Sequence, residues 1–428
     1  TTARDEAEAF QERGPLAGVR VIELGSFVAA PATTRILADF GADVIKVELP
    51  GAGDELRQWG VMAPTKTGAI SGWWLSLARN KRLITLNLRS AEGQALALRL
   101  IAQSQIVVEN FRPGRLESWG LTWERMREVN PAIVLARISG YGQTGPMSDR
   151  AGYGNVSESV GGLRYVTGYA DRPPVRVGVS MGDMLAAQQA ALGAVMALRV
   201  AEHTGVGQVV DVAITEAVFA MTEGMLTDYV HAGIVRERAG NELQRAAPSN
   251  VYRTGDGKWM AIGGNGENVF RRFTQAIGMP ELASDPRFSD NRARIDHHKA
   301  LDAIIGDWTE RHTQAEIQAL LDTAGVPAGP VMSIADIAAD PQFQARGMIA
   351  RVPDGRFASG EAVMPGIVPR LSGTPGVIRH AGGEVGADSA DVLGGLLGLS
   401  QEEQARLAAE GVTAGPRGAA IADKSPET

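Results

Sequence analysis

The chain contains no cysteine, and this absence excludes disulfides, thiolate metal sites and cysteine nucleophiles. Such a composition fits a reducing cytoplasm. No uninterrupted apolar run reaches the about 18 residues of a membrane-spanning helix. The stretch TTARDEAEAFQERG at the start is charged and lacks the apolar core of a secretory signal. We therefore expect a cytoplasmic protein that does not enter a membrane.

Positive charge is also in the minority, since the formal net charge is −7 at pH 7. This balance argues against a general nucleic-acid or membrane-surface binder, and an anionic ligand would need a local group of basic residues. The six histidines include no pair at i, i+4 spacing, so we expect no metal site. The first strand–helix turn, at 25–31, lacks the G-x-G-x-x-G spacing of dinucleotide folds, and we expect no tightly bound cofactor.

The chain does contain a regular alternation of strand and helix patterns. Hydrophobic residues make up 44% and charged residues 21%, as in ordinary globular proteins, and 428 residues exceed a single core. Short apolar runs typical of buried strands occur at 18–24, 43–48, 82–88, 105–110, 132–140 and 207–214. With helical patterns between them, these runs predict right-handed βαβ units and an α/β fold with a Rossmann-like parallel sheet.

The domain organisation is predicted from a change of character at 236–250, where the polar stretch RERAGNELQRAAPSN marks a domain crossing. We expect residues 1–225 to form the first part of a large domain. Residues 226–333 then form a smaller α+β domain with its linkers, and 334–428 return to the large domain. The tail after Val412 lacks core-forming residues, so we expect it to be mobile.

Asp183 is the most informative single residue of the sequence. It lies in the first turn of a predicted helix that runs to about Val200 and is apolar almost all round, which predicts a buried helix. Unpaired amides and the helix dipole favour a negative charge at that turn. The alternative is that Asp183 merely caps the helix, as most aspartates in this position do. Local sequence favours capping, and the rest of the chain has to decide.

The excluded chemistries leave a carboxylate as the candidate nucleophile. A nucleophilic carboxylate needs a dry pocket, an electrophile activated by the substrate itself and amides that hold the oxyanion. A thioester is such an electrophile. Ligands of parallel sheets bind beyond the carboxyl ends of the strands, which here are followed by the loops 48–54, 110–114 and 140–154.

Several segments, in this order and spacing, resemble the class III CoA-transferase family, which includes formyl-CoA, carnitine and dicarboxylate CoA-transferases. The likeness extends from Gly14 to about Val412. Its segments are GPLAGVRVIEL at 14–24, LADFGADVIKVELPGAGD at 37–54, ARNKRLITLNL at 78–88, VENFRPG at 108–114, ISGYGQTGP at 138–146, MGDM at 181–184, DPRFSDNRAR at 285–294 and AGVPAGPVMSIADIAADPQ at 324–342.

The resemblance implies a mechanism in which Asp183 is the nucleophile. Its carboxylate would attack the thioester of a donor acyl-CoA, giving a mixed anhydride and CoA thiolate. The thiolate would return to form an aspartyl-CoA thioester and release the donor acid. An acceptor carboxylic acid would then reverse these steps and leave as a new acyl-CoA. Coenzyme A is thus a cosubstrate, and holding it makes each return step effectively unimolecular.

The resemblance also implies positions for coenzyme A and for the acyl group. The family positions that line the CoA channel are Asn80, Lys81, Arg82, Asn110, Phe111 and Arg112. They would offer the phosphates cations and the adenine a flat apolar surface. Taken singly, Lys81 or Arg112 is equally explained as a solvated charge. The positions that shape the acyl pocket are Val28, Trp59, Trp73 and Tyr153.

The acyl pocket departs from that of formyl-CoA transferase. Val28 replaces a glutamine, Gly154 replaces a glutamate, and NELQRAAPS at 241–249 stands where that enzyme has a run of glycines. Formate or oxalate is therefore not the expected substrate, and Trp59 and Trp73 are alternatively simple core aromatics. A C-terminal motif of the family, G-E-H-T-D-E, is altered here to GGEVGADSAD.

Arg164 and Arg176 flank the Asp183 segment. They would pair with the second carboxylate of a C4 or C5 dicarboxylate such as succinate or malate, with succinyl-CoA as a possible donor. Surface arginines are the alternative reading.

Two other functions stay open. The same fold carries 2-methylacyl-CoA racemases, but these need a histidine base where this chain has Tyr153, and a phenol with a pKa near 10 is a poor base. The chain would otherwise be the partner subunit of a hetero-oligomeric CoA-transferase. The family implies an interlocked, ring-like homodimer.

Overall fold

The computed structural model describes residues 13–415. The charged stretch before residue 13 and most of the predicted tail lie outside this part. The chain forms two compact units. Among the described residues, the first comprises 13–163, 178–223 and 345–415, and the second comprises 164–177 and 224–344. The sequence had placed 164–177 in the large domain, because nothing in its composition separates it from its neighbours.

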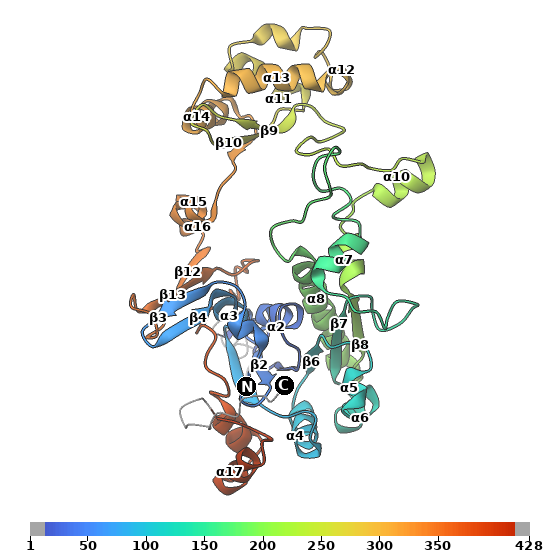
Figure 1. The fold of residues 1–428 in the computed structure, drawn as a ribbon, viewed down its shortest axis with the longest axis vertical. Coiled ribbons are helices and arrows are strands. Elements are labelled where there is room, and N and C mark those ends of the chain that lie inside the picture. The colour runs from blue at the N-terminus through green and yellow to red at the C-terminus, as the bar shows by residue number, and fades with distance from the viewer. Residues whose placement is uncertain (1–12, 416–428) are drawn as a thin grey trace, which may run out of the picture. The chain divides into compact units, whose positions relative to one another are not determined.

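A six-stranded parallel sheet forms the centre of the first unit, as the alternation of strands and helices predicted (Figure 1). Its strands are β1 (Arg20–Glu23), β2 (Asp43–Glu48), β5 (Lys81–Thr85), β6 (Ile106–Glu109), β7 (Val134–Ser139) and β8 (Val209–Ala213). They are arranged in the order β5-β2-β1-β6-β7-β8. The chain therefore starts in the middle, extends to one edge and then returns to build the other. This is the doubly wound order, and the direction reverses between β1 and β6.

Two hydrophobic cores cover the two faces of this sheet, because successive side chains of a strand point to opposite faces. Ile22 of β1 and Val107 of β6 face one core, and their neighbours Val21 and Val108 face the other. The helices of the first core are α4 (Ala91–Ile101), α5 (Arg115–Ser118), α6 (Trp123–Val129) and α17 (Gln401–Ala409). Those of the second are α2 (Ala29–Asp39), α8 (Met181–Thr204) and α9 (Ile214–Phe219).

The helix α8 is less buried than its sequence predicted. Its alanines pack against α2 and β7, where small side chains allow a close approach. Four apolar residues on another face are exposed: Leu192, Val195, Met196 and Val200. The prediction of a helix buried all round is therefore wrong for the single chain. Within the described part of the chain, α8 alone has the length and composition of a membrane span, which is weak evidence, since the core helix of a globular domain has them too.

Two stretches with a helical sequence pattern each form two shorter helices. The pattern at 114–129 forms α5 and α6, and that at 215–231 forms α9 and α10 (Met225–Ala232). Gly120 adopts a φ of 69° between α5 and α6, a conformation that ends a helix. Short elements of the first unit that had no clear pattern are β3 (Met62–Thr65), β4 (Gly68–Ser71), α3 (Gly72–Leu77), α7 (Gly154–Val160), β12 (Ile349–Pro353) and β13 (Glu361–Pro365).

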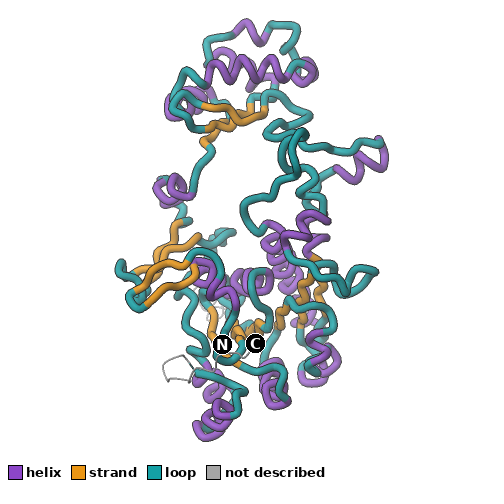
Figure 2. The backbone as a smooth tube through the Cα atoms, viewed as in Figure 1, coloured by secondary structure: helices purple, strands orange, loops and turns teal. Residues whose placement is uncertain are grey.

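The second unit is built on a small antiparallel sheet, with helices packed on it (Figure 2). Its strands are β9 (Ser249–Arg253), β10 (Trp259–Gly263) and β11 (Ala328–Pro330). Phe270, Phe273 and Trp308 are among the large buried side chains of its core. The helices are α10, α11 (Glu267–Ala276), α12 (Asn291–Asp296), α13 (His298–Thr309), α14 (Gln314–Ala324), α15 (Ile334–Ala339) and α16 (Pro341–Ala345), the last ending at the boundary of the unit.

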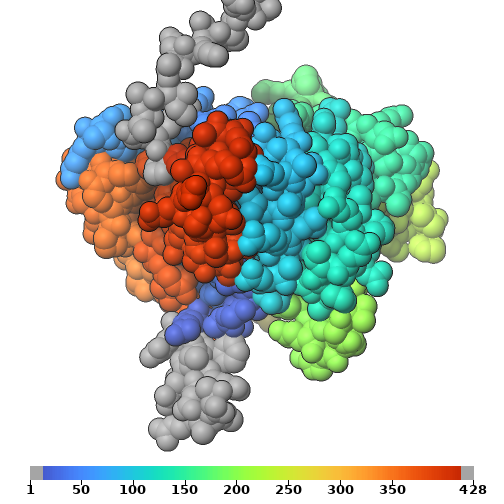
Figure 3. Space-filling model, turned by 90° about the horizontal axis from the view of Figure 1, so that it is seen from below, coloured from blue at the N-terminus to red at the C-terminus, as the bar shows by residue number. Residues whose placement is uncertain are grey.

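The C-terminal segment protects the edge strand β5. The Oδ2 atom of Asp388 accepts a hydrogen bond from the amide of Leu83 at 2.7 Å, and the amide of Asp388 donates to the carbonyl of Leu83 at 2.9 Å. These bonds occupy groups that an edge strand would otherwise expose. Further on, Arg406 of α17 pairs with Glu92 of α4 at 3.0 Å, and Figure 3 shows the red C-terminal segment against that part of the surface. The altered motif GGEVGADSAD thus has a structural role here.

A buried ion-pair cluster joins β1, β2 and β5. The carboxylate of Glu23 accepts from the ammonium groups of Lys46 and Lys81, each at 2.7 Å. Lys46 also pairs with Asp54 at 2.7 Å, and all four side chains are almost fully buried. Asp54 in turn accepts from the amide of Phe27, at 3.1 Å, so the cluster also holds the loop after β1.

Burial and charge act in opposite directions on the pKa values of this cluster. Burial outweighs the pairing with Glu23 at Lys81 and lowers its pKa to about 8. At Lys46, burial alone would lower the pKa, but the carboxylates of Asp54 and Glu23 outweigh it and raise the pKa above its ordinary value. The two lysines likewise outweigh burial at Glu23 and lower the pKa of that carboxyl. The cluster is thus a nearly balanced set of charges removed from water.

We expect Lys81→Met to lower the free energy of unfolding by about 3–5 kcal/mol, because removing one partner of a buried ion pair leaves an uncompensated charge. Urea unfolding followed by circular dichroism measures this. Arg112→Ala is the matched control, since Arg112 is exposed, and its change should stay within about 0.5 kcal/mol. Equal stability of the two variants would contradict a structural role for Lys81.

Candidate active site

Asp183 lies in the first turn of α8, at the carboxyl edge of the sheet. Ser180 precedes the helix as its N-cap, and Asp183 is the third helical residue. Because α8 leads into β8, which is parallel to β7, the helix begins at the edge where these strands end. Ligands of doubly wound sheets bind at this edge. Asp183 is half-buried and is not without a partner.

The carboxylate of Asp183 packs directly on the main chain of Gly154. A Cβ atom at position 154 would lie 2.1 Å from Oδ2 of Asp183 and 2.7 Å from Cγ. No side chain fits in that space. Gly154 begins α7, and Tyr153 is the residue before it. The structure therefore brings the predicted residues Asp183 and Tyr153 into one region.

Glu158 lies one turn further along α7 and contacts the backbone beside Asp183. Its side chain is fully buried, and Oε1 accepts a hydrogen bond from the amide of Gly182 at 3.2 Å. The first amides of a helix have no acceptor within the helix, so a side-chain carboxylate is a suitable partner. Sequence reasoning missed Glu158, because α7 is too short to show a helical pattern and nothing marks its glutamate as buried.

The loops after β1 and β6 meet where the strand order reverses. Asn110, directly after β6, accepts from the amide of Ser26 at 2.9 Å and donates to its carbonyl at 2.8 Å. Gly25 leaves no room for a Cβ atom, which would lie 2.4 Å from Oδ1 of Asn110. Of the residues predicted for coenzyme A, Asn110 therefore shapes the loop at the switch point of the sheet.

The next two residues extend from the same point. Phe111 is half-buried and packs edge to face on Trp119, with ring centroids 5.0 Å apart. Arg112 is exposed. Together they place an aromatic ring and a guanidinium at the carboxyl end of β6, and a guanidinium can pair with a phosphate.

The other group predicted for coenzyme A, Asn80 to Arg82, lies at the amino end of β5. In a parallel sheet this end is at the edge opposite to the carboxyl ends of β1 and β6, so the structure does not bring the two groups to one edge. Asn80 is buried and holds the C-terminal segment, with Oδ1 accepting from the amide of Arg379 at 2.7 Å. Lys81 is fully buried in the ion-pair cluster.

Arg82 is the third residue of that group. It pairs with Asp43 at 2.6 Å and with Asp391 at 3.2 Å. In this structure the three side chains hold the fold, and their contact with coenzyme A stays a prediction.

The predicted acyl-pocket residues fall near the start of α8 as well. Val28 is buried in a small apolar cluster with Trp74, and Trp73 and Met184 pack against this cluster. Met184 follows Asp183, so this cluster adjoins the candidate nucleophile.

The exposed aromatics of this region differ in their contacts. Trp59 is 49% exposed and stacks edge to face on Phe27, at 4.7 Å between ring centroids. Tyr153 is 74% exposed. Trp73 and Trp59 are thus only partly buried, and neither is a simple core aromatic.

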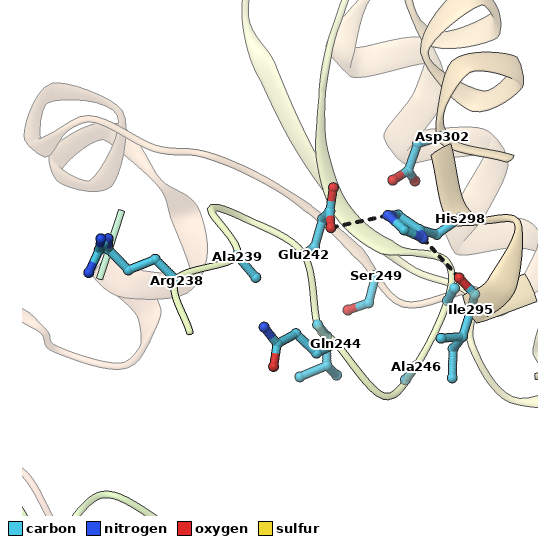
Figure 4. A pocket seen from close by; sticks show the side chains of 11 residues that line it. Arg238, Ala239, Glu242, Gln244, Ala246, Ser249, Ile295, His298 and Asp302 are labelled. Carbon is cyan, nitrogen blue, oxygen red and sulfur yellow. Dashed lines mark hydrogen bonds and ion pairs between the residues drawn. The ribbon is translucent and has the colours of Figure 1, made fainter. Parts of the chain in front are cut away.

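The second unit contains a cavity of about 340 Å³ beside the segment 238–249 (Figure 4). His298 and Glu242 contact each other in its wall, with 3.4 Å between Nε2 and Oε2. This segment includes NELQRAAPS at 241–249, which stands where formyl-CoA transferase has a run of glycines. Arg164, half-buried, and Arg176, exposed, belong to the second unit too. No group of three or more potential metal ligands occurs within residues 13–415.

Known proteins resemble this chain over most of its length. A model of the family described as "CoA-transferase family III" matches residues 16–389. The succinyl-CoA–D-citramalate CoA-transferase of Chloroflexus aurantiacus is 48% identical over 398 residues, which are 93% of this chain and 98% of that protein. The alpha subunit of succinyl-CoA–L-malate CoA-transferase from Chloroflexus aurantiacus is 40% identical over 93% of this chain and 92% of its own length.

A solved structure gives the same result. The crystal structure of a CAIB/BAIF family protein from Brucella suis matches with a TM-score of 0.81 at 32% identity, and the match covers 90% of this chain and 100% of that one. The likeness therefore holds for both sequence and fold over nearly the whole length. The chain belongs to CoA-transferase family III, as the order of its sequence segments indicated.

Proposed function

We propose that this CoA-transferase moves coenzyme A from succinyl-CoA to a free dicarboxylic acid, with Asp183 as the nucleophile. The observation that carries the proposal is the position of Asp183. It is half-buried in the first turn of α8, at the carboxyl edge of a doubly wound sheet, with its carboxylate against Gly154. Burial weakens solvation of the anion, and the helix start supplies amides and a favourable dipole.

The proposed reaction needs four acyl transfers. A carboxylate oxygen of Asp183 attacks the thioester carbonyl, and CoA thiolate leaves as a mixed anhydride forms. The thiolate attacks the aspartyl carbonyl of the anhydride, giving an aspartyl-CoA thioester and the free donor acid. The acceptor carboxylate displaces the thiolate to form a second anhydride. The thiolate finally attacks the acceptor's acyl carbonyl, so that the new acyl-CoA leaves and the carboxylate of Asp183 is restored.

Coenzyme A in this proposal is held at the switch point of the sheet. Phe111 and Arg112 supply the aromatic surface and the cation. Val28, Trp59, Trp73 and Tyr153 line the acyl end. Nothing in this arrangement requires a tightly bound cofactor.

The choice of substrates rests on the relatives. The proteins that are 48% and 40% identical are named for succinyl-CoA as donor and for citramalate or malate as acceptor. Both acceptors are hydroxy-dicarboxylates. The sequence-based prediction for the second carboxylate is Arg164 and Arg176, which both belong to the second unit. The racemase alternative has no support in these names, and Tyr153 is a poor base for α-proton removal.

We further propose a homodimer with the interlocked topology of the family. The exposed apolar residues of α8, at 192, 195, 196 and 200, support an interface on this face of the helix, because monomers rarely leave such a stripe uncovered. A relative is named as an alpha subunit and another as a beta subunit, so pairing with a second kind of chain is the alternative.

The cysteine-free composition supports a cytoplasmic location.

Trapping the intermediate tests the nucleophile. The purified chain, incubated with succinyl-CoA and then with hydroxylamine, should carry a hydroxamate on the peptide that contains Asp183, detected by mass spectrometry after digestion. Asp183→Asn should lose the adduct and on the order of 10³-fold or more of the turnover rate. Glu128→Gln, at an exposed carboxylate on α6, is the matched control and should behave as the wild type. An adduct on another residue would refute the proposal.

An acceptor screen tests the substrate class. With succinyl-CoA as donor, citramalate and malate should give new thioesters with a kcat/KM about 10- to 100-fold above that for formate or oxalate. This corresponds to the about 1–3 kcal/mol lost when a buried polar group is left without its partner. Chromatography with mass detection of each acyl-CoA measures it. A preference for formate or oxalate would contradict the dicarboxylate assignment.

Light scattering tests the homodimer. The wild-type chain should have twice the mass of one chain, and Met196→Glu should shift it toward the monomer, because an uncompensated charge would be buried in an apolar interface. Val129→Glu is the matched control, since Val129 is exposed on α6, on the opposite face of the sheet, and should leave the mass unchanged. A Met196→Glu variant that stays dimeric would remove α8 from the interface.

A further inference from the structure

One face of the short helix α7 contacts the turn that carries Asp183. Gly154 begins α7 and Glu158 follows four residues later, so the two share a face of the helix. Gly154 meets the side chain of Asp183, and Glu158 meets the amide of Gly182, the residue before it. A single element therefore contacts both the side chain of Asp183 and the backbone amide of the residue before it.

The contact at Gly154 leaves no tolerance for a larger residue. An added Cβ atom would lie 2.1 Å from Oδ2, 2.7 Å from Cγ and 3.0 Å from Oδ1 of Asp183, all well inside van der Waals distance. Either the carboxylate or the whole of α7 would have to move. The absent side chain therefore defines where the carboxylate lies.

The contact at Glu158 fixes the backbone. Its fully buried carboxylate accepts from the amide of Gly182 at 3.2 Å. Gly182 is itself closely packed, because a Cβ atom there would lie 3.1 Å from Ile214 and 3.2 Å from the carbonyl oxygen of Gly154. A buried carboxylate is costly unless it is hydrogen-bonded, and this one is bonded to the helical turn that orients Asp183.

We propose that Gly154 and Glu158 are positioning residues for Asp183, and that α7 sets the angle from which the carboxylate meets the thioester. The proposal rests on the function of Asp183 proposed above. Acyl transfer requires the reacting atoms to be about 3–3.5 Å apart and aligned, and a displacement of about 1 Å can cost on the order of 10²-fold in rate. Neither residue needs to touch the substrate.

Gly154→Ala tests the first contact. The rate of aspartyl hydroxamate formation from succinyl-CoA, measured by rapid quench and mass spectrometry, should fall by about 100-fold, while the KM for succinyl-CoA changes little. Gly161→Ala is the matched control, because a Cβ atom at the other end of α7 would lie 2.7 Å from Val218 and not near Asp183. It should lower the melting temperature but leave the rate per folded molecule unchanged.

Two substitutions at Glu158 test the second contact. Glu158→Leu removes the acceptor for the amide of Gly182 and should lower kcat by about tenfold or more. Glu158→Gln keeps an oxygen acceptor and should recover most of that loss, which a role in packing alone would not predict. Ser157→Ala changes a buried neighbour on α7 whose hydroxyl has no hydrogen-bond partner among residues 13–415, and it should match the wild type.

The outcomes separate this proposal from the one on which it rests. If the wild type forms no adduct at Asp183, the nucleophile assignment fails. If the wild type forms the adduct, but Gly154→Ala and Glu158→Leu form it at the same rate per folded molecule, the positioning role is refuted. A loss of activity that follows the folded fraction, measured by circular dichroism, would refute it as well.

Discussion

The buried pairing of Glu23 with Lys46 and Lys81 is the interaction on which the first unit depends. It ties together three neighbouring strands through charges that burial would otherwise make costly. Asp54 extends it to the amide of Phe27, so the same cluster fixes the loop after β1. The switch point of the sheet is therefore held by groups that cannot reach water, and the site is built on a rigid base.

The position of the candidate nucleophile depends on two glycines that leave space beside it. Asp183 lies where Gly154 leaves space, and Gly182 lets the start of α8 approach α7. Close packing of this kind lets a carboxylate be partly desolvated and yet held in one place, which is what attack on a thioester requires. Polar residues alone would not give this precision, because their side chains have more rotamers.

Residues that match the same kind of family position in the sequence can have different structural roles in the fold. Arg112 and Lys81 both match positions for coenzyme A in the sequence, but Arg112 is exposed at the switch point whereas Lys81 is buried between strands. Asn110 holds a loop and Asn80 holds the C-terminal segment. A charged or amide side chain can bond equally well to a ligand or to other residues of the chain. The sequence does not show which of these partners lies nearer.

The sequence by itself determined the parallel α/β sheet and the family, because these follow from local periodicity and from the order of motifs along the chain. The choice of Asp183 as nucleophile came from the resemblance to that family and stays a prediction. Only the tertiary structure decided that α8 exposes an apolar face, that 164–177 belongs to the second unit, and that Glu158 and Gly154 meet the turn of Asp183. These facts depend on contacts between segments distant in sequence, for which no local pattern exists.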